Sequence, residues 1–103
     1  MANAPTFDIG DQVRSSASFR NAGGTAADPT GVKFLHAEPD GTETTYVFGV
    51  DGEVVQDSTG EFHFDVIAAA AGRHVVRSVG SGVVAAAQER PFIVRESVFT
   101  TPT

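Results

Sequence analysis

Apolar and polar residues alternate with a period of two along most of this chain. Residues 61–67 show the alternation most clearly, with Phe62 and Phe64 on one face and His63 and Asp65 on the other. A two-residue period is typical of a strand that buries one face. Stretches of this kind predict strands at residues 11–20, 32–38, 43–48, 53–56, 61–67, 73–79 and 83–94.

Glycine and proline separate these stretches. Pro39-Asp40-Gly41-Thr42 is a strong turn signal, because proline presets φ and glycine accepts a positive φ. Pro91 falls inside the last stretch and predicts an edge position or a bulge there, since proline has no N–H to donate. The pattern predicts an all-β sandwich or barrel of about seven antiparallel strands. We expect a leader at residues 1–10, one β-sandwich domain at 11–96 and a tail at 97–103.

Charge and composition narrow the classes of function. The chain has 103 residues and a formal net charge of −6, and its seven Lys and Arg residues are scattered singly. Nucleic-acid binding needs clustered basic residues, and an acidic surface suits anionic membranes poorly, so neither partner is expected. The chain has no cysteine, which excludes disulfides and thiol chemistry. No signal peptide is evident at the start, so we expect synthesis in a cytoplasm.

Several motifs follow one another in a specific order. They are Asp28-Pro29-Thr30, Pro39-Asp40-Gly41-Thr42, Asp57-Ser58-Thr59-Gly60, the glycine-bounded segment 72–80 and the late Phe92-Ile93-Val94. Over residues 8–94 their order and spacing resemble a family of small immunoglobulin-like structural proteins of tailed bacteriophages and prophages. The resemblance implies an immunoglobulin-like β-sandwich, a place in the virion and no catalytic residues. This chain departs from the family at His36 and His74, where the family carries an apolar and an aromatic residue.

On this resemblance we expect a non-enzymatic virion structural protein, and first of all a capsid (head) decoration protein that docks on capsid subunits. A head–tail connector or tail accessory protein is the alternative within the virion. A bacterial adhesion or carbohydrate-binding β-sandwich module is an alternative from another class. The expected partners are capsid or connector subunits, and a homo-oligomer is also open. We expect no cofactor, metal, small-molecule substrate, nucleic acid or membrane, and localisation in the virion after synthesis in the host cytoplasm.

The corner before residue 62 has two interpretations. Asp57, Ser58 and Glu61 could give oxygens to Ca²⁺, but calcium takes about six to eight oxygen ligands and this run offers too few. We favour a turn in which Asp57 accepts bonds from nearby backbone N–H groups and Gly60 takes a positive φ. Ser58 and Ser81 are placed in turns without a base-orienting motif, so no catalytic residue is predicted.

Three histidines need separate interpretations. His63 and Asp65 could bind a transition metal if a neighbouring strand brought a third ligand, but an exposed polar face explains them fully. His36 and His74 fall on the inward stripe. They are either a pH switch, because an enclosed imidazole resists protonation, or core residues satisfied by a backbone carbonyl, and we favour the second interpretation.

The candidate protein interface is the apolar strip formed by Val83, Val84, Ala85, Ala86 and Ala87. Both faces of a strand here would be apolar, although only one can face the domain's own core. Small, flat side chains on the other face would suit close docking of another protein. The alternative is a strand covered by its own neighbours.

Overall fold

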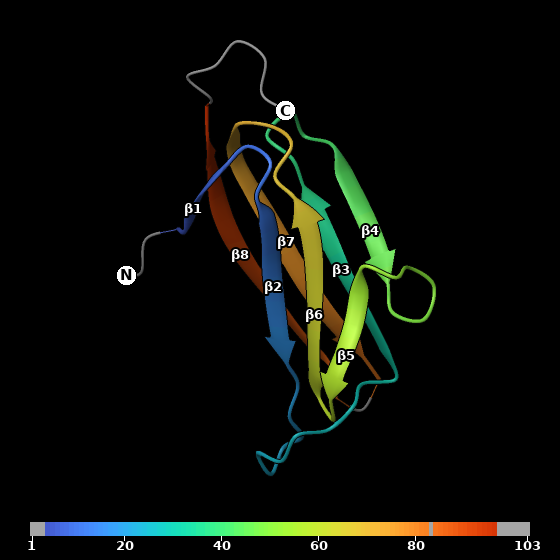
Figure 1. The fold of residues 1–103 in the computed structure, drawn as a ribbon. Coiled ribbons are helices and arrows are strands. Elements are labelled where there is room, and N and C mark those ends of the chain that lie inside the picture. The colour runs from blue at the N-terminus through green and yellow to red at the C-terminus, as the bar shows by residue number, and fades with distance from the viewer. Residues whose placement is uncertain (1–3, 83, 97–103) are drawn as a thin grey trace.

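The computed structural model describes residues 4–82 and 84–96, and these form eight strands and no helix (Figure 1). The strands are β1 Thr6–Asp8, β2 Gln12–Ser18, β3 Gly31–Ala37, β4 Glu43–Val47, β5 Val54–Ser58, β6 Glu61–Ile67, β7 Gly72–Ser81 and β8 Ala86–Arg95. The prediction of an all-β fold is confirmed. Each predicted stretch overlaps one strand, although β3, β5, β7 and β8 extend beyond the predicted bounds, and β1 is additional.

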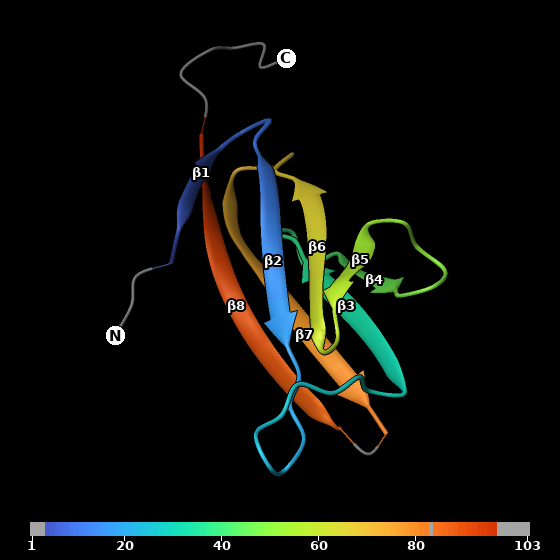
Figure 2. The ribbon, with the colours of Figure 1, turned by 60° about the horizontal axis from the view of Figure 1, so that its bottom comes forward.

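The strands form two sheets that pack as a sandwich. The large sheet has five strands in the order β1-β8-β7-β3-β4, and the small sheet has three in the order β2-β6-β5. In Figure 1 the small sheet lies in front of the large one, and Figure 2 shows the same two layers after a turn. The chain changes sheet after β1, β2, β4 and β6. Strands that lie side by side therefore often come from distant parts of the sequence.

β1 differs from the sequence prediction in two ways. It lies within residues 1–10, where the sequence indicates only a leader, and it pairs in parallel with β8, with Thr6 opposite Ile93 and Asp8 opposite Arg95. The other five strand pairs are antiparallel, as predicted. An ion pair of 2.7 Å between Arg95 and Asp8 closes this edge. Three residues are too few for a two-residue period to stand out, so the pattern does not reveal this strand.

The core between the sheets is largely aromatic. Phe64 stacks on Phe34 with ring centroids 5.5 Å apart, and Tyr46 packs against Phe64 at 4.7 Å. Phe62 meets Phe19 edge to face at 5.8 Å. These contacts confirm that the two phenylalanines of β6 face inward, and they join β6 of the small sheet to β3 and β4 of the large one.

The turn before β6 is present but shorter than predicted, because only Thr59 and Gly60 form it. β5 continues to Ser58, so Asp57 lies in a strand. Gly60 does take a positive φ of 74°, as predicted. Its N–H, however, donates to Oδ1 of Asp28 at 2.7 Å, a residue in the loop before β3. The prediction that Asp57 bonds nearby backbone N–H groups is wrong, because its carboxylate faces His63 instead.

β8 begins at Ala86, later than predicted. Its first half pairs with β7 on one side and has no strand on the other side among the described residues. β1 covers only the last residues of β8, where the N–H of Ile93 donates to the carbonyl of Pro5 at 2.9 Å. The main-chain N–H and C=O groups of successive strand residues point to opposite edges of the strand. The main-chain groups of Pro91 therefore point to the same edge as those of Ile93. No strand lies beside Pro91 there among the described residues. The predicted edge position of this proline is confirmed.

Candidate functional site

The residues of the predicted interface strip are placed in different surroundings. Val83 lies outside the described residues, and Val84 is 8% exposed and part of the domain's own core. For Val84 the alternative interpretation, a side chain covered by its own neighbours, is the correct one. Ala85, Ala86 and Ala87 are exposed. Only this second half of the strip is open to a partner.

Ala86 and Ala87 border an open groove between β8 and β2, which we call the β2–β8 groove. One hollow of about 280 Å³ is lined by these alanines and, across the gap, by Ala17, Ser18 and Phe19. A second hollow of about 340 Å³ lies farther along the same two strands. Its lining includes Phe7, Val13, Arg14, Arg90, Pro91 and Phe92. The exposed alanines and a partly apolar cleft therefore lie along the same pair of strands.

The groove lies where the small sheet ends at β2 and the first part of β8 has no neighbouring strand on its outer side among the described residues. β2 has β6 on one side and no strand on the other within the described residues, and β1 flanks only the end of β8. Figures 1 and 2 both show β8 and β1 lying beyond the free edge of β2. In the sequence, Pro91 signals that β8 has a free edge. Nothing in the local pattern indicates that β2 lies opposite, because that follows from the order of the strands.

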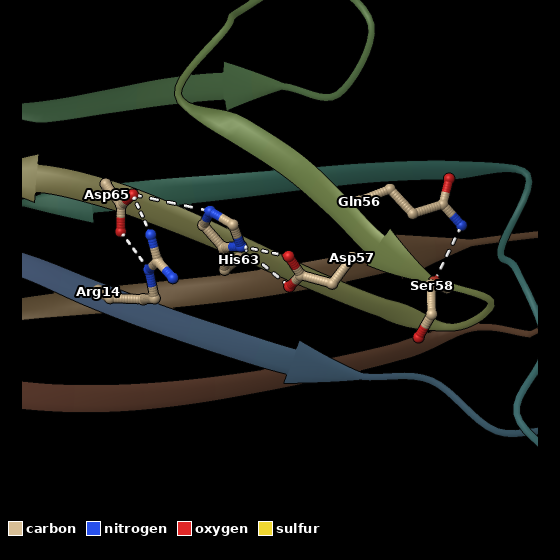
Figure 3. Close-up of polar contacts among 6 residues, drawn as sticks. All are labelled: Arg14, Gln56, Asp57, Ser58, His63 and Asp65. Atoms are coloured by element: carbon tan, nitrogen blue, oxygen red, sulfur yellow. Dashed lines mark hydrogen bonds and ion pairs between the residues drawn. The ribbon is translucent and has the colours of Figure 1, made fainter.

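A chain of ionic contacts crosses the small sheet (Figure 3). Arg14 of β2 donates to both carboxylate oxygens of Asp65 on β6, at 2.8 and 2.9 Å. The His63 ring lies between two carboxylates, with Nδ1 2.8 Å from Asp57 and Nε2 3.6 Å from Asp65. Hydrogen bonds from Arg14, with a smaller effect of the nearby His63, hold the pKa of Asp65 below its ordinary value. The contacts link all three strands of the small sheet.

This arrangement corrects the prediction that His63 belongs to an exposed polar face. His63 is only 8% exposed, although it points away from the core between the sheets. Among the described residues no three His, Asp or Glu side chains are grouped so that they could hold a metal ion. Glu61 instead accepts a hydrogen bond from Ser18 on β2 at 2.7 Å. The sequence predicts turns at Ser58 and Ser81. This prediction is wrong, because Ser58 is the last residue of β5 and Ser81 the last residue of β7.

His36 and His74 are buried and face each other across β3 and β7. His36 Nε2 lies 2.9 Å from His74 Nδ1, and the His74 ring stacks on Phe92 with centroids 4.7 Å apart. His74 Nε2 donates to the carbonyl of Ala70 at 2.7 Å. A carbonyl oxygen can only accept, so a neutral His74 accepts at Nδ1 and His36 donates to it through Nε2–H. The favoured interpretation, a core histidine satisfied by a backbone carbonyl, holds for His74.

The buried position of His36 also makes acid destabilising. Burial first, and the facing His74 second, lower the pKa of His36 below its ordinary 6.5, although Glu38 opposes this shift. The unfolded chain then takes up a proton at a higher pH than the folded chain does. The contribution of His36 to stability is therefore fully present above about pH 6.5 and is lost as the pH drops below it. We expect the unfolding temperature, measured by circular dichroism, to fall by several degrees between pH 7.5 and pH 5.

The control is a double variant, His36→Leu with His74→Phe, in which this fall should be largely absent. In His63→Gln the fall should persist, because His63 lies on the other sheet, outside the core. An unfolding temperature of the unaltered protein that stays level across this pH range would contradict the assignment.

Comparisons with known proteins find no match for this chain. The chain matches no family model, no curated protein and no solved structure. The described residues form no helix long and apolar enough to cross a membrane. A function for this chain therefore has to be argued from the fold, the groove and the motifs in its sequence.

Proposed function

We propose that this chain is an immunoglobulin-like sandwich whose role is to bind other proteins without catalysis. In immunoglobulin domains one sheet holds strands C, F and G, extended by C′ in the variable type, and the other holds B, E and D. The order β8-β7-β3-β4 opposite β2-β6-β5 corresponds to G-F-C-C′ opposite B-E-D. This correspondence supports the immunoglobulin-like assignment that the sequence motifs suggest.

The proposed role is that of a bacteriophage virion structural protein, a head decoration protein that docks on capsid subunits. The observation that carries the protein-binding part is the exposed strip Ala85, Ala86 and Ala87 beside the open β2–β8 groove. The bacteriophage part rests on the order and spacing of the sequence motifs. A lone sandwich leaves strand edges and apolar surface open, and docking on a lattice would cover both.

The docking surface can be tested by adding purified domain to capsids made without it. We expect saturable binding. Ala86→Glu should abolish it, because the charged side chain would project into the groove, which Ser18 and Phe19 line from the other side. Sedimentation with the capsids, followed by gel quantification, measures this.

The matched control is Val50→Glu, at a position that is 80% exposed. Val50 belongs to the loop between β4 and β5, and Figure 1 shows this loop on the opposite side of the fold from β8. This variant should bind as the unaltered domain does. Loss of binding in Val50→Glu but not in Ala86→Glu would contradict the proposed surface and place docking on the β4–β5 loop.

A further inference from the structure

We infer that the second hollow of the β2–β8 groove, which we call the Phe92 cleft, binds a small molecule with an apolar body and a single carboxylate head. The ligand would be held and not converted, and it would be a second kind of partner besides the proteins proposed above. Three features of the cleft point to it: its size, its apolar lining toward β1, and one arginine without an ionic partner farther from β1.

The Phe92 cleft has the size of a small-molecule site. Its volume is about 340 Å³, which lies at the lower end of the range of about 300–1,000 Å³ that is usual for ligand pockets. Residues of β2 line one side and residues of β8 the other, and Pro5 and Phe7 at β1 contribute as well. Three separate segments of the chain therefore enclose a volume that a small molecule can occupy.

The end of the cleft near β1 is apolar. Val13 on β2 and Phe92 on β8 are each only 3% exposed, so the cleft reaches side chains of the core. Phe7 of β1 meets Phe92 edge to face, with ring centroids 5.8 Å apart. An alkyl or aryl body placed against these side chains would be removed from water, which favours binding.

Arg90 brings a positive charge to the part of the cleft farther from β1. It lies two residues before Phe92 and opposite the buried Val76 of β7, so its side chain leaves β8 on the inward face, as that of Phe92 does. Two residues of a strand span about 7 Å, which separates the charge from the apolar end. Ser15, two residues after Val13 on the inward face of β2, lines the same cleft and adds a hydroxyl group.

The Arg90 guanidinium is available to an anion. Its Nη2 donates to Oε1 of Gln88 at 3.2 Å, a neutral partner, and it joins no ion pair within residues 4–82 and 84–96. Arg14, which also lines the cleft, is instead held by both carboxylate oxygens of Asp65 on the outer face of the small sheet. No acidic side chain belongs to the described lining. A guanidinium can donate two parallel N–H groups to one carboxylate, so Arg90 favours a carboxylate head.

The two parts of the cleft together select the class of ligand. Arg90 is exposed, so a carboxylate bound to it would stay partly in water while the body of the ligand lies against Phe92. A cationic head would be repelled at this position, and a head with several negative charges would meet only one arginine without an ionic partner. A monocarboxylate with a short alkyl or aryl body fits both parts.

The test is a titration of the isotope-labelled full chain with sodium octanoate, below the concentration at which it forms micelles, followed by NMR. We expect saturable shifts that are largest at the amides of Val13, Ser15, Arg90 and Phe92. Octylammonium, which has the same apolar body and the opposite charge, should bind at least about tenfold more weakly. Hexanoate, which is two CH₂ groups shorter, should also bind about tenfold more weakly. Equal binding of octanoate and either of these two compounds would overturn the inference.

A charge-removing variant and a matched control locate the site. Arg90→Gln is a change at an exposed position, and it should weaken octanoate binding about tenfold or more without weakening octylammonium binding. The control is Arg77→Gln, because Arg77 is also exposed but lies on the outer face of the same sheet, opposite Glu89. It should bind octanoate as the unaltered chain does. Unchanged octanoate binding in Arg90→Gln, or an equal loss in both variants, would overturn the inference.

The ligand site and the proposed docking on capsids can fail independently. Failure of octanoate to bind, with the domain still docking on capsids, would reject the ligand site alone. Saturable binding of octanoate that depends on Arg90, by a domain that is absent from particles, would support the ligand site and reject the virion role.

Discussion

Replacing Phe64 by alanine is expected to destabilise the domain by about 3–5 kcal/mol, the usual cost of removing a buried phenylalanine. The Phe64 side chain is fully buried, stacks on Phe34 and packs against Tyr46. Its loss would open a cavity at the point where the two sheets meet. A domain of this size has a total stability of about 5–15 kcal/mol, so a large part of it would be lost.

Chemical denaturation of the purified variant measures this effect, with Ile67→Ala as the control on the same strand. Ile67 is 55% exposed, and its replacement should change stability by about 0.5 kcal/mol or less. A Phe64→Ala protein as stable as the unaltered one would show that β6 has been assigned the wrong inward face.

Gly60→Ala is expected to be the second most damaging change, at about 2–5 kcal/mol. Gly60 has a φ of 74°, which costs an alanine about 1–2 kcal/mol. A Cβ at this position would also lie 2.5 Å from the carbonyl oxygen of Phe19 and 3.0 Å from the N of Ala27. Overpacking against backbone adds about 1–3 kcal/mol, because neither atom can move without breaking the corner.

Gly49→Ala separates the two causes in the same denaturation assay. Gly49 has a similar φ of 89°, but nothing lies within 4 Å of its Cβ position. It should therefore show only the backbone cost of about 1–2 kcal/mol. Equal losses in the two variants would contradict the close approach of the Phe19 carbonyl to Gly60.

The sequence predicts the strands of this fold better than it predicts their arrangement. The alternation in β6 is local, so the inward positions of Phe62 and Phe64 can be read directly from it. β1 forms through pairing with residues at the other end of the chain, as the bond between Asp8 and Arg95 illustrates. No local pattern contains that information, and the β2–β8 groove has the same origin.

Burial of particular side chains also depends on distant partners. Alternation correctly places His63 on the face away from the core, but it does not show that His63 is buried there and contacts Asp57 and Asp65. Val84 belongs to an apolar run whose two faces look alike in sequence, and only the packed structure shows that it enters the core. Composition alone therefore overstates the size of the candidate interface.

The central claim, that this domain decorates a capsid, is tested most directly by counting its copies in intact virus particles. Particles purified from cells that carry the gene would be analysed by quantitative mass spectrometry, with the major capsid protein and the portal protein as internal standards. The account predicts a copy number that scales with the capsid subunits and far exceeds that of the portal. A copy number equal to the portal's, or absence of the domain from the particles, would contradict it.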